Sequence, residues 1–226
     1  MINKIFQIGF NKCGTSSLFK LFKDCSVPRL NAIHWDKGLL AHTIQQNILA
    51  GIPALSSYEH FTFFSDMECL YVDKNSGEVK LLFSHVEFFE ILDRQYPGSK
   101  FILNTRSLDS WLQSRLNHLV GWEPVNNGRV GRMKESIPYE QYNLKHYGLS
   151  SREDLLQKWR DDWYRHHQAV IQYFTERKDD LLVFDIEQDP LAYLKSFFAP
   201  YGIKFMADEL PRENQTSLVS EPALHR

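Results

Sequence analysis

The sequence predicts an α/β protein, folded as a single domain around a mostly parallel central sheet with helices on both faces. Apolar runs of strand length occur at residues 4–9, 100–106 and 181–186. Each run is followed by a segment whose apolar residues have helical spacing. Strands that alternate with helices pair in parallel, because the helix carries the chain back across the sheet before the next strand begins.

Composition limits the classes of protein to which the chain can belong. Its 226 residues, 43% of them hydrophobic, suffice for one sizeable core, so we expect a single domain over residues 1–226. A net charge of -2 argues against a nucleic-acid partner bound through a broad basic face. No run approaches the ~20 apolar residues of a membrane span. Three cysteines without metal-type spacing, and an N-terminus unlike a signal peptide, predict a cytoplasmic protein.

The first strand–helix unit contains a glycine-bearing loop. The strand at 4–9 leads through Lys12 and Gly14 into a helix expected over 15–23. A helix N-terminus directs unpaired N–H groups at one point, which favours binding of phosphate or sulfate. Gly9 and Gly14 have the glycine spacing of a Walker A loop, but Lys12 precedes the second glycine by two places, so the loop is not of that type.

A second short strand is expected over 30–35, followed by a helix over about 40–48 that ends before Gly51. His34 then lies at the carboxyl end of a strand, the edge at which open α/β sheets bind ligands. Asp36 is expected to cap the following helix. Residues 52–72 mix aromatic and acidic residues without a clear period, which predicts irregular structure.

The next segments repeat the strand–helix pattern. Ser84 and Glu87 have the spacing of a capping box, which predicts a helix from there to Tyr96. The strand at 100–106 leads into a helix expected to reach Leu119.

The second half contains one segment of unusual composition. Residues 120–148 hold few apolar residues and several glycines and asparagines, which predicts a long functional loop, such as a lid or a segment that lines a binding site. A capping box at Ser150 and Glu153 predicts a long helix, in which His166 and His167 are expected at the boundary or surface. A helix over about 192–198 follows the last strand.

Two motifs resemble a known family. Lys12-Cys13-Gly14-Thr15-Ser16 resembles the P-loop-like 5'-phosphosulfate loop of sulfotransferases that use 3'-phosphoadenosine 5'-phosphosulfate (PAPS). Arg106 and Ser114, eight residues apart after a strand, resemble the pair that binds the 3'-phosphate in that family, and the resemblance runs from about residue 4 to 200. The chain departs from many cytosolic members in two ways. Ser17 stands where they have an adenine-stacking tryptophan, and their glycine-rich C-terminal motif is missing.

The resemblance implies PAPS as co-substrate, 3'-phosphoadenosine 5'-phosphate as product, and no metal. It implies that Lys12 neutralises charge on the leaving phosphate and that His34 is the general base, with Glu59, His60, Asp66 and Glu68 as alternatives. The segment 211–214 is a further candidate to approach the cofactor. The cofactor-binding residues implied are Lys12, Cys13, Gly14, Thr15, Ser16, Ser17, Arg106 and Ser114.

The acceptor is expected to be a hydroxyl of a saccharide or small molecule. The candidates for stacking on a ring are Trp35, Tyr58 and Trp122, and the candidates for meeting an acidic group are Arg129, Arg132 and Lys134. Two other functions stay open at this point. A P-loop kinase or NTPase would need a lysine after the second glycine, and a catalytically silent nucleotide-binding relative would lack a base.

Overall fold

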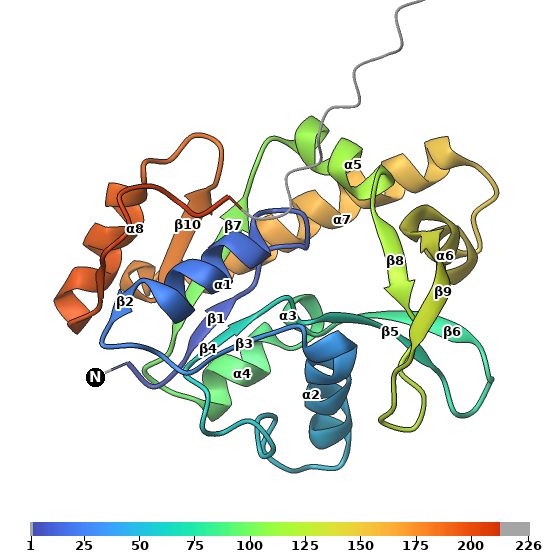
Figure 1. The fold of residues 1–226 in the computed structure, drawn as a ribbon, viewed down its shortest axis with the longest axis horizontal. Coiled ribbons are helices and arrows are strands. Elements are labelled where there is room, and N and C mark those ends of the chain that lie inside the picture. The colour runs from blue at the N-terminus through green and yellow to red at the C-terminus, as the bar shows by residue number, and fades with distance from the viewer. Residues whose placement is uncertain (1, 213–226) are drawn as a thin grey trace, which may run out of the picture.

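The computed structural model, which describes residues 2–212, is an α/β domain built on a five-stranded parallel sheet (Figure 1). The strand order is β10-β7-β1-β4-β3, and every neighbouring pair runs parallel. The expected fold class is therefore confirmed. The strands of this sheet are β1 (Ile5–Gln7), β3 (Ala32–His34), β4 (Phe63–Ser65), β7 (Lys100–Thr105) and β10 (Leu181–Asp185).

Helices cover both faces of the sheet, because alternate residues of each buried strand point to opposite sides. Phe6 of β1 packs in one core with residues of α2, α4 and α7, whereas Ile5 packs in a second core with residues of α1 and α8. The helices are α1 (Thr15–Asp24), α2 (Leu39–Leu49), α3 (Ser84–Glu87), α4 (Phe89–Gln95), α5 (Leu108–Leu116), α6 (Tyr139–Tyr147), α7 (Arg152–Tyr173) and α8 (Leu191–Phe198), with short 3-10 turns η1 (Asp36–Gly38), η2 (Lys178–Asp180) and η3 (Ala199–Tyr201).

Three antiparallel pairs complete the described fold. They are β2 (Ser26–Val27) with β11 (Lys204–Phe205), β5 (Glu68–Val72) with β6 (Val79–Phe83), and β8 (Leu119–Trp122) with β9 (Arg132–Pro138). Figure 1 shows the β5–β6 and β8–β9 hairpins extending together beyond one side of the central sheet.

The prediction of irregular structure over 52–72 is wrong, since this segment contains β4 and all of β5. β4 is only three residues long and is buried on both faces, so it has no alternation of apolar and polar residues to reveal it. It nevertheless lies between β1 and β3 in the sheet.

The predicted loop at 120–148 is largely ordered into β8, β9 and α6. Leu119 begins β8 and is 57% exposed, instead of ending the preceding helix. Few residues of the hairpin are buried, which explains its loop-like composition. Tyr139 and Asn143 of α6 are buried, and Asn143 accepts a hydrogen bond from Trp159 of α7 at 3.0 Å.

Three predicted helix caps are also wrong in detail. Ser84 donates its hydroxyl to the carbonyl of Ala41 at 2.9 Å, so it does not cap α3. Ser151, one residue after the predicted Ser150, accepts the capping bond from the amide of Asp154. Gly38, not Asp36, precedes α2 as its N-cap.

His166 and His167 are buried, whereas a boundary or surface position was expected. His166 donates from Nε2 to the carbonyl of Ile8 at 2.7 Å, and His167 bonds the hydroxyl of Thr105 at 3.0 Å. Apolar spacing could not reveal this, because the burial comes from the packing of α7 across the sheet. The two imidazoles tie α7 to the carboxyl-terminal ends of β1 and β7.

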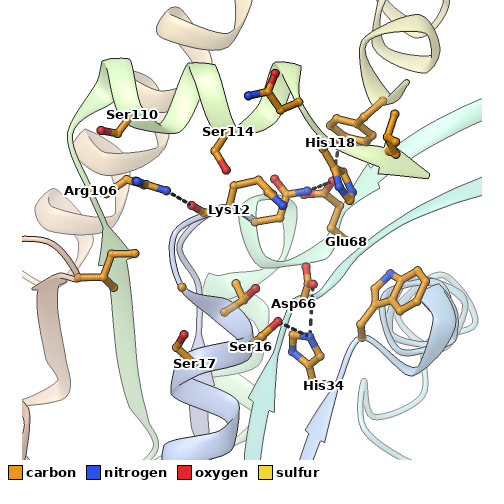
Figure 2. Close-up of a pocket in the computed structure, with 18 of the residues that line it drawn as sticks. Lys12, Ser16, Ser17, His34, Asp66, Glu68, Arg106, Ser110, Ser114 and His118 are labelled. Carbon is orange, nitrogen blue, oxygen red and sulfur yellow. Dashed lines mark hydrogen bonds and ion pairs between the residues drawn. The ribbon is translucent and has the colours of Figure 1, made fainter. Parts of the chain in front are cut away.

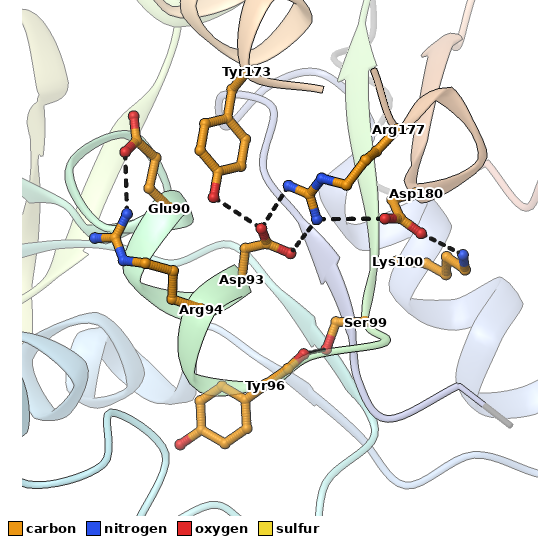
Figure 3. A network of polar contacts seen from close by, with 9 residues as sticks. All are labelled: Glu90, Asp93, Arg94, Tyr96, Ser99, Lys100, Tyr173, Arg177 and Asp180. Atoms are coloured by element: carbon orange, nitrogen blue, oxygen red, sulfur yellow. Dashed lines mark hydrogen bonds and ion pairs between the residues drawn. The ribbon is translucent and has the colours of Figure 1, made fainter. Parts of the chain in front are cut away.

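A polar network stabilises the domain at the opposite ends of the strands (Figure 3). Asp93 of α4 accepts hydrogen bonds from Tyr173 at 2.8 Å and from Arg177 at 2.6 Å. Lys100, at the amino end of β7, pairs with Asp180 at 2.6 Å. The network joins α4, the end of α7 and β7 on the side away from the cleft described next.

Candidate functional site

A large open cleft of about 2530 Å³ lies over the carboxyl ends of the parallel strands. Typical small-molecule sites occupy roughly 300–1,000 Å³, so this cleft has room for two ligands side by side. Figure 2 shows Arg106 and His34 on opposite sides of Lys12 within it. The order of the strands explains the arrangement: Arg106 follows β7, Lys12 follows β1, Asp66 follows β4, and His34 ends β3.

The loop between β1 and α1 is held in shape by Asn104, a fully buried residue of β7. The Asn104 side chain accepts from the amide of Gly9 at 2.9 Å and donates to the carbonyl of Cys13 at 2.8 Å. A Cβ atom at Gly9 would lie 1.9 Å from the Asn104 carbonyl oxygen, which explains the glycine. Lys12 and Gly14 both have positive φ angles, 64° and 75°. The turn directs the N-terminus of α1 into the cleft, where its dipole favours an anion.

Lys12 lies beside two carboxyl groups. Burial lowers the pKa of the Lys12 ammonium, while the nearby Asp66 and Glu68 oppose this change. The Lys12 side chain therefore lies in the cleft between the loop and these acids.

Cys13 differs from the other implied cofactor residues. Its side chain is fully buried in the core formed with Trp111 and Leu155, and burial raises the pKa of its thiol to about 12. Only the backbone of Cys13 can face a ligand. The other implied cofactor residues, namely Lys12, Gly14, Thr15, Ser16, Ser17, Arg106 and Ser114, line the cleft.

Arg106 is fixed by two partners. It donates from Nη1 to the carbonyl oxygen of Lys12 at 3.2 Å and from Nε to the carboxylate of Glu187 at 3.0 Å. Burial raises the pKa of Glu187, but hydrogen bonds from Arg106 and Ser107 outweigh this effect and lower it overall, so the carboxylate is ionised. Ser110, one turn before Ser114 on α5, lines the same cleft. Neither Glu187 nor Ser110 is among the residues predicted from the sequence, although the helical spacing of Ser110 from Ser114 could have indicated it.

His34 lies on the other side of Lys12. Its Nδ1 is 2.7 Å from the Ser65 hydroxyl, and its Nε2 is 3.4 Å from the Ser16 hydroxyl and 3.7 Å from Asp66. The imidazole stacks on Phe19 with ring centroids 5.1 Å apart. Burial lowers the pKa of His34 to about 4, so its imidazole is neutral at pH 7.

Two of the alternative bases lie in the cleft and two do not. Burial raises the pKa values of Asp66 and Glu68 to about 7 each, against the opposing charge of Lys12. Asp66 has a φ of 54°, a strained conformation for a residue other than glycine. Glu59 and His60 precede β4 and do not line the cleft, because they lie at the amino end of the strand.

A buried chain of polar residues orients Glu68. Its Oε1 accepts from Asn11 at 2.7 Å and from the hydroxyl of Tyr139, which in turn accepts from Arg115 at 3.0 Å. Arg115 is buried among aromatic rings, with its guanidinium 4.8 Å from the ring centroid of Trp159. Within residues 2–212, Glu68 Oε2 has no hydrogen-bond partner.

Only some of the residues predicted to contact the acceptor lie in the cleft. Trp35, Trp122 and Arg132 line the cleft, whereas Tyr58, Arg129 and Lys134 do not. Tyr58 donates its hydroxyl to Asp36 at 3.0 Å, beneath the turn that follows β3. Of the segment 211–214, Pro211 and Arg212 line the cleft, while residues 213 and 214 lie outside the described part of the chain.

Comparison with known families agrees with these motifs. A family profile described as a sulfotransferase domain matches residues 4–194. The chain belongs to the sulfotransferase domain family. The match covers both strand–loop–helix units and all five strands of the sheet, and it confirms the resemblance to a sulfotransferase. No curated protein matches the chain at a significant level.

Membership in this family indicates sulfuryl transfer in general, and the family generally uses PAPS as its donor. In the described residues, no group of three or more His, Cys, Asp or Glu side chains could hold a metal ion. No helix between residues 2 and 212 has the length and apolar character needed to cross a bilayer.

Proposed function

We propose that this sulfotransferase-family chain moves the sulfuryl group of PAPS to an acceptor hydroxyl by in-line transfer. One observation carries the proposal. The Lys12 loop and the Arg106–Ser114 pair, far apart in sequence, follow adjacent parallel strands and open onto one cleft. PAPS carries a phosphosulfate at one end and a 3'-phosphate at the other. It therefore needs two anion sites that are close enough for one molecule to occupy both.

The proposed donor site uses the α1 side of the cleft. The N-terminus of α1, with the hydroxyls of Thr15 and Ser16, would hold the 5'-phosphosulfate. Arg106 would bind two oxygens of the 3'-phosphate, and Ser110 and Ser114 would supply hydroxyl donors from one face of α5. Glu187 now accepts from Arg106, so we expect it to give up part of that contact when the phosphate binds.

Lys12 is proposed to stabilise the leaving group. Negative charge develops on the bridging oxygen as the sulfur–oxygen bond breaks, and an ammonium already in place stabilises that charge without reorganisation. The Lys12 side chain lines the cleft, and its ammonium would offer three N–H donors to that oxygen.

The acceptor is proposed to enter from the β3 and β4 side, opposite Arg106. In-line transfer requires the attacking hydroxyl to face the sulfur from the side away from the leaving phosphate. His34, Asp66 and Glu68 lie on that side.

His34 is proposed as the general base. With Nδ1–H donated to the Ser65 hydroxyl, its Nε2 is an unprotonated acceptor that faces the cleft. Asp66, 3.7 Å from Nε2, would stabilise the imidazolium that forms. The alternative is that Asp66 or Glu68 takes the proton directly, since pKa values of about 7 are well matched to a general base at neutral pH.

The β8–β9 hairpin is proposed as a cover over the acceptor. Leu119 and Trp122 of β8, with Arg132 of β9, line the cleft.

The proposed location of the protein is the cytoplasm. The three cysteines Cys13, Cys25 and Cys69 are all free thiols, which is the usual state of cysteines in a reducing compartment.

Calorimetric titration and a transfer assay together test the function. The protein should bind 3'-phosphoadenosine 5'-phosphate and not ATP, because ATP lacks the 3'-phosphate. Sulfur-labelled PAPS should then transfer its label to members of a panel of saccharides and phenols. Tighter binding of ATP would favour a kinase or NTPase. Binding of the product nucleotide without transfer or hydrolysis of PAPS would indicate a catalytically silent relative.

A further inference from the structure

Two cations lie over one indole ring at the β3 side of the cleft. Lys37 Nζ is 5.3 Å and the Arg132 guanidinium 5.6 Å from the ring centroid of Trp122. All three residues line the cleft. Within residues 2–212, neither cation forms an ion pair with a carboxylate. Their charge is therefore available to a ligand.

The fold brings these three side chains together from separate segments. In the β8–β9 hairpin, Arg132 is the register partner of Trp122, which places the two side chains beside each other. Lys37 belongs to the turn after β3. Trp35 of the same turn contacts Trp122 edge-on, with ring centroids 6.0 Å apart.

The turn that presents Lys37 is strained. Trp35, Asp36 and Lys37 have φ angles of 55°, 46° and 57°, a region that residues other than glycine rarely adopt. The turn is held in place by the Tyr58 hydroxyl on Asp36 and by Gly38, where a Cβ atom would lie 2.8 Å from that of Cys69. Residues that the surrounding structure keeps in such rare backbone conformations cluster at functional sites.

Neighbouring acids do not cancel the two charges. Glu140 is held by Arg152 through two hydrogen bonds of 2.7 Å. Glu123 lines the cleft beside Gly131, but among residues 2–212 it forms no ion pair with Lys37 or Arg132. This end of the cleft also lies across Lys12 from Arg106, so it is separate from the proposed 3'-phosphate site.

We infer that Lys37, Arg132, Trp35 and Trp122 form an acceptor subsite for a ring-bearing anion, that is, an acceptor with a carboxylate or sulfate ester near its reactive hydroxyl. A planar guanidinium binds such groups through paired hydrogen bonds, and the indole holds both cations toward the cleft. The inference rests on the proposed function, since it names the acceptor class of the same site.

Binding of matched neutral and anionic probes tests the inference, with and without saturating 3'-phosphoadenosine 5'-phosphate. One pair is 4-nitrophenyl β-D-glucuronide against the corresponding glucoside, and the other is 4-hydroxyphenylacetate against 4-ethylphenol. The first pair represents an acidic saccharide and the second an acidic phenol. In at least one pair, the anion should bind about tenfold more tightly at low salt, and the difference should shrink at about 0.5 M salt.

Two double variants assign the preference to this subsite. Lys37→Gln with Arg132→Gln should abolish it, and Arg129→Gln with Lys134→Gln should not, because that control removes the same charge from hairpin residues outside the cleft. Equal binding within both pairs, or a preference that survives Lys37→Gln/Arg132→Gln, overturns the inference. Failure to bind 3'-phosphoadenosine 5'-phosphate would instead count against the proposed function, and the titrations without that nucleotide still measure the anion preference.

Discussion

The guanidinium of Arg106 donates a hydrogen bond to the backbone carbonyl of Lys12 across 3.2 Å. The two residues lie 94 positions apart and follow neighbouring strands, β7 and β1. The bond makes the shape of the Lys12 loop depend on the residue proposed to bind the 3'-phosphate.

Replacing Lys12 with alanine should reduce kcat by roughly 10²–10³-fold, the usual effect of removing one group that stabilises transition-state charge. Thermal unfolding should change little, because the Lys12 side chain lines the cleft and belongs to none of the described core clusters. Lys23→Ala, an exposed lysine on α1, is the control and should keep its rate. A folded Lys12→Ala protein with near-normal kcat would remove Lys12 from the mechanism.

Arg106→Ala should weaken 3'-phosphoadenosine 5'-phosphate by roughly 10–100-fold, the loss expected for charge-assisted hydrogen bonds. Adenosine 5'-phosphate should be affected far less, since it lacks the 3'-phosphate. Glu187→Gln should bind the 3'-phosphate at least as well as the parent, because it removes the carboxylate that now accepts from Arg106. Calorimetry with both nucleotides measures these changes. Equal weakening of the two nucleotides by Arg106→Ala would contradict the assignment.

The pH dependence of kcat/KM should identify the base. A base works only when unprotonated, so the rate falls as pH drops through its pKa. With His34 as base, the rate should hold down to about pH 5 and fall near its pKa of about 4. With Asp66 or Glu68 as base, the fall should come near pH 7.

Substitution completes this test of the base. His34→Asn should lose the rate together with the acidic fall, while binding of 3'-phosphoadenosine 5'-phosphate is retained. If Asp66→Asn abolishes a fall near pH 7 and His34→Asn leaves it in place, then the proton goes to the carboxylate.

Asn104→Ala should lower the free energy of unfolding by roughly 2–4 kcal/mol, because it leaves the Gly9 amide and the Cys13 carbonyl without partners in a buried site. It should also weaken nucleotide binding by loosening the loop. Chemical denaturation measures the first effect, and Asn75→Ala, in an exposed turn, should change stability little. Unchanged stability in Asn104→Ala would show that the loop holds its shape by other contacts.

Hydrogen exchange should slow in the β8–β9 hairpin when cofactor and acceptor analogues are both bound, if the hairpin covers the acceptor. The amides of α7 in the core should show no comparable change. Exchange in the hairpin that is unaffected at saturation of both ligands would refute its role as a cover.

The sequence alone predicted the fold class and the strand–helix units at β1, β7 and β10. Those strands are apolar and lead into helices with clear spacing, so local pattern suffices. The same pattern missed β4, β5 and the β8–β9 hairpin. A three-residue strand buried on both faces has no alternation, and an exposed hairpin lacks the apolar content of a strand.

The resemblance of two short motifs to a known family supplied most of the donor-site candidates, because Lys12, Arg106 and Ser114 each lie in a motif contained within one strand–loop–helix unit. Only the tertiary structure decided how these units meet. The order β10-β7-β1-β4-β3 places Arg106 and His34 on opposite sides of Lys12, buries the thiol of Cys13, and brings Asp66 and Glu68 beside the lysine while Glu59 and His60 stay at the other end. Charge, burial and pKa depend on neighbours that the chain reaches only by folding, so local spacing carries no information about them.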